Sequence, residues 1–440
     1  MLRFDFHIQK IRSTAFPHGL QLRSPRNLDR LITSSVQHLH MASSTHHDHS
    51  LTGQSLKKVS LDRLMRFGPP PLSPSKLIES AELTRQELIQ RIQRRVNAHL
   101  SLPYLPASNP HIKQVMSIYR RSFEEINSLP PIRTVEDNAA LLQALVTMVD
   151  DATDVIGMFA TGFKESKRYL SEEQISSFLN RAIQSRISIR LIAEQHLSLS
   201  KAEHSPSPSR TGIVDKKMNL KKTLESVLQF AAELCEGTFG IAPEWRLSGE
   251  VEAEVCFVEM HHPLTDLLIV FFISCKVIKN ALRATVEHHR EVTKTTNPPL
   301  PPIEVAVAVE RPPRVAVNSK ETTDRSLSDA EISKSILCIR IRDHGGGIDP
   351  QDLPRVFSYA FSTVGSEDKA KDGMHNQADF DRISYGQEEL KSSLGRIAGL
   401  GFGLPMARLY CRYFGGNLEL VNMHGVGGGV DSYITIAVGT

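Results

Sequence analysis

The stretch Ile341-Arg-Asp-His-Gly-Gly-Gly-Ile348 decides the fold of this 440-residue chain. Upstream of it, from Leu337 to Ile341, apolar and polar residues alternate, which predicts a half-buried strand. The strand runs into Asp343, and three consecutive glycines follow at 345, 346 and 347. Glycines can adopt positive φ and let the backbone approach a ligand closely. Asp343 would then be a fixed hydrogen-bond acceptor, which suits an exocyclic amine such as that of adenine.

A second glycine segment, Gly399-Leu-Gly-Phe-Gly-Leu-Pro405, leads directly into a predicted helix over residues 405–415. Pro405 suits the first helical position, and Gly415 or Gly416 would end the helix. A glycine loop that feeds a helix N-terminus is a favourable anion site. Each glycine segment alone is a weak signal, because most glycine-rich turns are only turns.

The third element is a predicted helix around residues 276–287. At 100° per residue, its polar residues Lys276, Asn280, Arg283 and Glu287 share one face, and the apolar residues lie away from it. The amide oxygen of Asn280 could bind Mg²⁺, which bridges nucleotide phosphates. On its own, this face could equally be a solvated helix surface.

The order of the three elements resembles the GHKL ATPase superfamily of histidine kinases, MutL and the heat-shock chaperone ATPases. The residues within these elements resemble a narrower family, the mitochondrial 2-oxoacid dehydrogenase kinases. This family comprises pyruvate dehydrogenase kinase and branched-chain 2-oxoacid dehydrogenase kinase. The matching stretches are 279–287, 355–363 and 401–410, with Ser185-Arg-Ile-Ser-Ile-Arg-Leu-Ile-Ala-Glu-Gln-His196 upstream. The resemblance extends over roughly residues 55–440.

The resemblance implies an α+β fold with an N-terminal four-helix bundle followed by a GHKL-type (Bergerat) ATP-binding α/β sandwich. It also implies transfer of the γ-phosphoryl group of Mg-ATP to a serine on the decarboxylase component of a 2-oxoacid dehydrogenase complex. Asn280 would bind the Mg²⁺, and Asp343 would accept from the adenine amine. The ATP-binding residues carried over are Asn280, Arg283, Glu287, Asp343, Gly345, Gly347, Ser362, Thr363, Gly399, Leu400, Gly401, Phe402, Gly403 and Leu404. The expected partners are the decarboxylase and the lipoyl-bearing core of the complex, in the mitochondrial matrix, and the expected state is a homodimer.

One position departs from the family pattern. Where the family has a glutamate four residues before the Mg²⁺ asparagine, this chain has Lys276. A protonated lysine cannot deprotonate a serine hydroxyl. The apolar run 267–275 is also longer than its equivalent in the family by about six residues, so an insertion could have displaced the glutamate. The catalytic base therefore stays unassigned.

Three hypotheses remain open from the sequence. The first is an active mitochondrial protein-serine kinase, and the second is a nucleotide-binding pseudokinase that acts as a scaffold on the same complex. The third is a sensor histidine kinase or a repair-type ATPase. The chain contains neither a Walker motif nor a His-Arg-Asp catalytic loop, which disfavours a P-loop enzyme and a typical protein kinase.

The N-terminal half is predicted to be helical. Residues 1–50 are basic and contain few acids, which fits a mitochondrial transit segment or, alternatively, a disordered tail. Residues 51–200 form the predicted bundle, with 3.6-residue spacing at 79–100, 110–127, 135–169 and 171–199. On the last helix, Arg186, Arg190 and His196 are expected to be structural or interfacial rather than part of a phosphohistidine relay.

Residues 201–217 are expected to form a polar linker, and 218–440 the kinase domain. Strands are predicted at 303–309, 336–342, 418–423 and 432–438, between helices at 219–236, 266–289 and 405–415. This pattern favours a sandwich over a doubly wound parallel sheet. Loop insertions are expected at about 288–334 and 365–396, and the second would be either a lid over ATP or a passive loop.

The composition is that of an ordinary globular protein with room for two domains, at 40% hydrophobic and 23% charged residues. A net charge of +3 gives no reason to expect a nucleic-acid partner. No apolar run is long enough to predict a membrane span. The five cysteines show no metal-ligand spacing and are expected to be reduced thiols.

Overall fold

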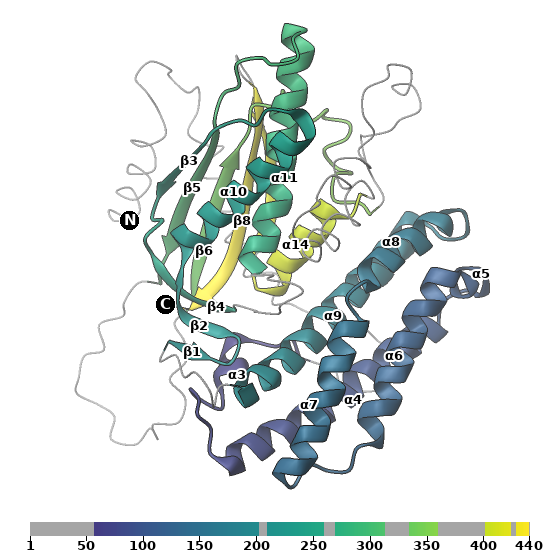
Figure 1. Cartoon of the computed structure of the whole chain (residues 1–440). Coiled ribbons are helices and arrows are strands. Elements are labelled where there is room, and N and C mark those ends of the chain that lie inside the picture. Colours follow the sequence, from purple (N-terminus) through teal and green to yellow (C-terminus); the bar gives the residue numbers. More distant parts are fainter. Residues whose placement is uncertain are drawn as a thin grey trace.

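A computed structural model of the chain describes residues 57–201, 209–258, 269–312, 334–359, 401–423 and 428–439. The predicted transit segment 1–50 and the predicted loop 365–396 lie outside these residues. Figure 1 shows a helical region beside a twisted sheet that carries helices on one face. In the described part of the chain, no helix combines the length and apolar character needed to cross a bilayer. The five cysteines are free thiols, as expected.

Local capping signals set the ends of the N-terminal helices. Ser73 and Asn109 cap helices that have proline in the first turn, and Thr134 forms a reciprocal capping box with Asp137. The elements are α3 (Leu61–Met65), α4 (Pro74–Leu100), α5 (Tyr104–Ser108), α6 (Pro110–Ser128), α7 (Val135–Asp151), α8 (Val155–Glu165), the 3₁₀ turn η1 (Lys167–Tyr169) and α9 (Glu172–Lys201).

The single helix predicted over 135–169 is wrong, because the chain turns between α7 and α8. The junction contains Asp151, Thr153 and Asp154, short polar residues whose side chains compete for backbone hydrogen bonds and favour helix ends. The apolar spacing continues across the junction, so hydrophobic periodicity alone could not reveal it.

Helix α9 is the central helix of this region, buried along most of its length and packed against α4 and α7. His196 is fully buried, with Nδ1 3.0 Å from Ser80 Oγ on α4 and Nε2 2.8 Å from Asn138 Oδ1 on α7. Burial lowers the pKa of His196 to about 4. The prediction of a structural histidine is confirmed.

The sheet is mixed and mainly antiparallel. Its strands are β1 (Arg210–Thr211), β2 (Val214–Asn219), β3 (Trp245–Gly249), β4 (Glu254–Val258), β5 (Ile303–Glu310), β6 (Lys334–Arg342), β7 (Asn417–Met423) and β8 (Gly429–Gly439). The order is β1-β2-β4-β8-β6-β5-β3, β7 also pairs with β8, and only β3 and β5 run parallel among the described pairs. This arrangement confirms the expected α+β class and excludes a doubly wound parallel sheet.

Among the described residues, three helices accompany the sheet: α10 (Leu220–Phe239), α11 (Ile269–Thr293) and α14 (Gly403–Tyr413). Helix α11 contacts β6 and β8, packs against α10 on one side and against α14 on the other (Figure 1). Helix α14 begins at Gly403, two residues before the predicted Pro405, and ends before Gly415, which has φ +79°. Gly415 can adopt this conformation without a Cβ clash, as the predicted helix end requires.

Two predicted irregular segments contain strands. The linker 201–217 holds β1 and residues 214–217 of β2, and the loop 288–334 holds the end of α11 and the whole of β5. The strand prediction at 303–309 is confirmed, since β5 alternates buried Ile303, Val305, Val307 and Val309 with small or charged residues. Short strands such as β1 and β3 depend on their sheet partners and have little local signal.

Candidate functional site

One stripe of α11 contacts both glycine segments. Residues 276, 280, 284 and 288 follow one another at four-residue spacing, so they lie along one side of the helix. A methyl group built on Gly345 would lie 2.5 Å from Ala284 Cβ, and one on Gly346 would lie 2.5 Å from His288 Nδ1. The loop after β6 therefore rests directly on the C-terminal half of α11, with no room for side chains in between.

The other end of the stripe meets the second glycine segment. A methyl group built on Gly403 would lie 3.9 Å from Lys276 Cδ. Asn280 lies between these contacts, one helical turn, or about 6 Å, from Lys276 and from Ala284. Asn280 is exposed. The structure thus brings the asparagine and the two glycine segments together, as the sequence predicts.

Asp343 is held at the end of β6 and is 7% exposed. Its Oδ1 accepts hydrogen bonds from the backbone N–H of Gly345 at 2.9 Å and of Val430 at 3.0 Å, and its own N–H donates to Val430 O at 3.1 Å. Both side-chain bonds fall on the same oxygen, so the direction of Oδ2 is fixed. Burial raises the pKa of the Asp343 carboxyl above its usual value, and the two backbone donors act against this shift.

The loop after Asp343 depends on glycine and on an asparagine that the sequence did not single out. Gly346 and Gly347 have φ values of +79° and +93°. Asn422 on β7 accepts from Ile348 N–H at 2.9 Å and donates from Nδ2 to Ile348 O at 2.6 Å, which fixes the end of the loop. A single asparagine in a strand gives no signal for this role, because its partner is 74 residues away.

The N-terminus of α14 forms the other side of the site. Gly401 has φ +72°, the N-cap residue Phe402 makes no capping hydrogen bond through its side chain, and the first turn contains no acid. The first backbone N–H groups of a helix lack intrahelical partners and carry partial positive charge. The backbone at Gly403 and Leu404 is therefore suited to an anion.

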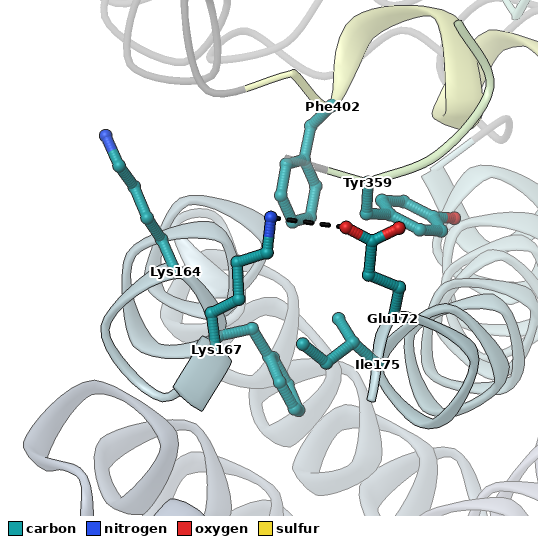
Figure 2. Close-up of a pocket in the computed structure, with 7 residues that line it drawn as sticks. Lys164, Lys167, Glu172, Ile175, Tyr359 and Phe402 are labelled. Atoms are coloured by element: carbon teal, nitrogen blue, oxygen red, sulfur yellow. Dashed lines mark ion pairs between the residues drawn. The ribbon is translucent and has the colours of Figure 1, made fainter. Parts of the chain in front are cut away.

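The ring of Phe402 is 1% exposed. It lies 5.0 Å from the ring of Tyr359, whose hydroxyl donates to Asn180 Oδ1 on α9 at 2.8 Å. Figure 2 shows both rings in a small pocket where the Lys167–Glu172 ion pair joins η1 to α9. Sequence reasoning missed Tyr359 and Asn180, which are 179 residues apart.

The predicted polar face of α11 needs a correction at its first residue. Lys276 is only 6% exposed, with Nζ 5.7 Å from the centre of the Phe272 ring. It packs where α11 meets α14, so the solvated-surface interpretation is wrong for this residue. Arg283 and Glu287 lie further along, and Arg283 Nε donates to Glu287 Oε1 at 2.8 Å.

Four of the predicted ATP-binding residues, Ser362, Thr363, Gly399 and Leu400, lie outside the described residues. Within the described ranges, no group of three or more His, Cys, Asp or Glu side chains could hold a metal ion. Asn280 fits a different kind of site, in which one protein oxygen and the phosphates of a nucleotide share the Mg²⁺. Its exposed amide between two glycine segments meets that requirement.

Comparison with known families gives two matches that together cover most of the chain. Residues 58–215 match the family described as mitochondrial branched-chain alpha-ketoacid dehydrogenase kinase. Residues 275–439 match the family described as histidine kinase-, DNA gyrase B- and HSP90-like ATPase. The second match begins at Cys275, the last residue of the apolar run 267–275.

Curated relatives match along almost their full length. A mitochondrial pyruvate dehydrogenase (acetyl-transferring) kinase of Arabidopsis thaliana is 28% identical over 384 residues, covering 86% of this chain and 90% of the relative. The corresponding kinase of Schizosaccharomyces pombe is 27% identical, covering 86% and 92%, and kinase 1 of Saccharomyces cerevisiae is 25% identical, covering 83% and 80%. Together these matches support a place for the chain among the mitochondrial pyruvate and branched-chain 2-oxoacid dehydrogenase kinases, protein kinases of the GHKL superfamily.

Proposed function

We propose that this protein is a protein-serine kinase of the mitochondrial matrix that phosphorylates, and thereby inactivates, the decarboxylase component of a 2-oxoacid dehydrogenase complex. One observation carries the proposal: a single stripe of α11 contacts both glycine segments and presents Asn280 between them. Full-length relatives are named pyruvate dehydrogenase kinases, whereas the N-terminal family match is of the branched-chain type. Both decarboxylases are therefore candidate substrates.

In the proposed site, Asp343 accepts a hydrogen bond from the adenine amine, and Gly345 and Gly347 let the base approach. The backbone from Gly399 to Leu404 binds the phosphates. Arg283, Glu287, Ser362 and Thr363 complete the nucleotide site, as in the family. Bound Mg²⁺, held by Asn280 and the phosphates, would neutralise charge on the transferring group, and phosphoryl transfer depends mainly on such positioning and neutralisation.

We assign the regions of the chain accordingly. Residues 1–50 would direct import, 51–200 would form a four-helix bundle, and 218–440 would form the kinase domain. The proposed partners are the decarboxylase and the lipoyl-bearing core, and the proposed state is a homodimer. The capped and mutually packed helices α4, α6, α7 and α9 support the bundle.

A second candidate function is a nucleotide-binding scaffold on the same complex. Lys276 favours it, since this residue stands one turn before Asn280, where the family has the glutamate that orients or deprotonates the serine. A lysine could act as a base only if its pKa were strongly lowered. This candidate predicts nucleotide binding without phosphate transfer.

One labelling experiment separates these functions. The purified chain is incubated with γ-labelled Mg-ATP and with each decarboxylase component, and Asn280→Ala serves as the matched inactive variant. If the chain is a kinase, we expect wild type to label serine and the Asn280→Ala variant to label it at least about 100-fold more slowly. The reason is that loss of the Mg²⁺ ligand removes several kcal/mol of transition-state stabilisation. Nucleotide binding without labelling would contradict the kinase function and support the scaffold function.

The same gel distinguishes a histidine kinase. Phosphohistidine is lost in acid, whereas phosphoserine survives it. Acid-labile label on the chain itself would overturn both candidates. The buried His196, bonded on both ring nitrogens, is not available for such a relay.

A further inference from the structure

We propose that Thr285 is a positioning residue for base recognition, because its hydroxyl fixes the backbone beside Asp343 and so directs the carboxylate at the 6-amino group of adenine. The inference rests on the nucleotide site proposed above and deepens it, since it concerns how that site distinguishes adenine from other bases. It holds whether or not the chain transfers phosphate.

The side chain of Thr285 is fixed by the helix that carries it. Thr285 is fully buried on α11, and its Oγ1 lies 2.9 Å from Ala281 O. A carbonyl oxygen can only accept, so the hydroxyl donates to Ala281. The hydroxyl proton is therefore used within α11, and the oxygen can still accept from a donor outside the helix.

The donor is in the loop that follows β6. The backbone N–H of His344 donates to Thr285 Oγ1 at 3.2 Å. The next N–H along the chain, that of Gly345, donates to Asp343 Oδ1 at 2.9 Å. Thr285 therefore holds the peptide group that joins Asp343 to His344, directly beside a hydrogen bond that orients the carboxylate.

The composition of the loop makes such an anchor important. Residues 345–347 are all glycine, which restricts the backbone less than any other residue does. The loop therefore depends on its neighbours for its position. On the side of β8, Gly346 N–H donates to Gly428 O at 2.8 Å. On the side of α11, Thr285 supplies a hydrogen bond next to the close contact of the loop with Ala284.

A carboxylate held in this way can distinguish between purines. The hydrogen bonds from Gly345 and Val430 both reach Oδ1 of Asp343, so Oδ2 is the oxygen directed at the amine. A site built to bond a polar group discriminates against an analogue that lacks the group. If the loop shifts, adenine loses this hydrogen bond, whereas a base without the amine has no such bond to lose. The Thr285 hydroxyl should therefore affect base selectivity.

The test compares, by calorimetry, the affinities of Mg-ADP and of Mg²⁺-bound purine riboside 5′-diphosphate, which carries hydrogen in place of the 6-amino group. We expect wild type to prefer ADP by about tenfold or more, as for a hydrogen bond to a charged group. Thr285→Val keeps the shape of the side chain and removes the hydroxyl, and it should lower this preference by about threefold or more. Thr285→Ser keeps the hydroxyl and should retain the preference.

Thr223→Val is the matched control. Thr223 on α10 is also buried, and it donates to Asn219 O at 3.0 Å, the same local bond that Thr285 makes to Ala281. We expect this variant to keep the wild-type preference. If Thr285→Val does not fold, Thr285→Ala removes the hydroxyl with less volume and gives the same comparison. Hydrogen exchange of the His344 amide should also be faster in Thr285→Ala than in Thr285→Ser.

The outcomes are distinct. Wild type that binds neither nucleotide contradicts the proposed function. Wild type that binds both equally contradicts the role of Asp343, and the assignment of Thr285 with it. A preference for ADP that is unchanged in Thr285→Val overturns only the assignment of Thr285. A preference that falls in Thr285→Val and is retained in Thr285→Ser and Thr223→Val supports the assignment, since a general loss of stability would weaken both nucleotides alike.

Discussion

At the scale of single residues, Asp343 shows how the chain fixes a polar side chain at a position proposed to recognise a ligand. The carboxylate is nearly buried, and Oδ1 is occupied by the N–H groups of Gly345 and Val430. Gly429 must be glycine here, since a methyl group on it would lie 2.1 Å from Asp343 O. A side chain fixed this way loses little conformational entropy when it binds an amine.

The first prediction concerns the protonation of Asp343. Burial raises its pKa, so the carboxyl takes up a proton at a higher pH than an ordinary aspartate does. A protonated oxygen no longer accepts from an adenine amine. We expect the affinity for Mg-ADP to fall on acidification at a pH above the normal aspartate range, and Asp343→Asn to bind weakly at every pH.

Calorimetric titrations over a pH series check this, with each variant's fold verified by circular dichroism. The same shift has a consequence for folding. Because the folded-state pKa is raised, ionisation of Asp343 costs stability as pH rises through that pKa, and the cost is relieved below the unfolded value. An Asp343→Asn variant that binds adenylates like wild type would contradict the assigned role.

At the scale of elements, α11 organises the site by contact with both glycine segments. One of the two closest approaches is between Gly345 and Ala284. A helix and a loop can be this close only when both residues are small, so neither glycine nor alanine can be enlarged without separating them.

The second prediction tests this contact. Gly345→Ala would bring two methyl groups to 2.5 Å, so the loop must move away from α11. We expect at least about a tenfold loss of adenylate affinity from a displacement of that kind. Ala284→Gly in the same chain should restore part of the affinity, because it removes the closest clashing atom. Gly237→Ala is the control, since nothing lies within 4 Å of a methyl group there.

Helix α9 has a comparable role in the helical region through His196, which joins α4 and α7. The third prediction is that this histidine makes the stability pH-dependent. Its folded pKa is about 4, below the ordinary value of 6.5, because burial penalises the charged ring. The unfolded chain therefore binds the proton first, and stability is lost as pH falls from about 6.5 towards 4.

Urea denaturation at pH 7.5 and pH 5.0 measures this effect for wild type and His196→Gln. We expect wild type to lose on the order of 1–2 kcal/mol more than His196→Gln over this interval. His99, whose pKa burial also lowers to about 4, remains in both proteins and contributes equally. Equal losses in the two proteins would contradict the prediction.

At the scale of the whole molecule, a few buried hydroxyls connect the helical region to the sheet region. Tyr413 at the end of α14 accepts from Val59 N–H at 3.1 Å and lies 2.8 Å from Ser188 Oγ on α9. Ser188 itself donates to Gln184 O, so the tyrosine is the donor in their bond. One phenol thus joins the start of the described chain, α9 and α14.

The fourth prediction is that Tyr413→Phe lowers the free energy of unfolding by about 1–2 kcal/mol, since a buried donor and a hydroxyl lose their partner. Tyr169→Phe, at a position that is 41% exposed, is the control and should change stability by less than about 0.5 kcal/mol. Thermal and denaturant unfolding measure both. Equal effects of the two substitutions would mean that the hydrogen bonds of Tyr413 contribute nothing to the free energy of unfolding.

The sequence by itself determined the features that depend on neighbouring residues. It predicted β6 ending at Asp343, the glycines that need positive φ, the central helix carrying Asn280, and most helices of the N-terminal region. Each of these features follows from a local pattern of alternation, periodicity or capping. Such a pattern involves only residues that are close together in the sequence.

Only the tertiary structure decided which of these features contact one another and which of their side chains are buried. It buried Lys276, placed the ring of Phe402 against that of Tyr359, and added Asn422 and Tyr359, whose partners lie 74 and 179 residues away. It also made strands of part of the segment 201–217, which the sequence predicted to be a linker. The physical reason is that burial and long-range hydrogen bonds depend on the packed neighbours of a residue, and a local pattern carries no information about those neighbours.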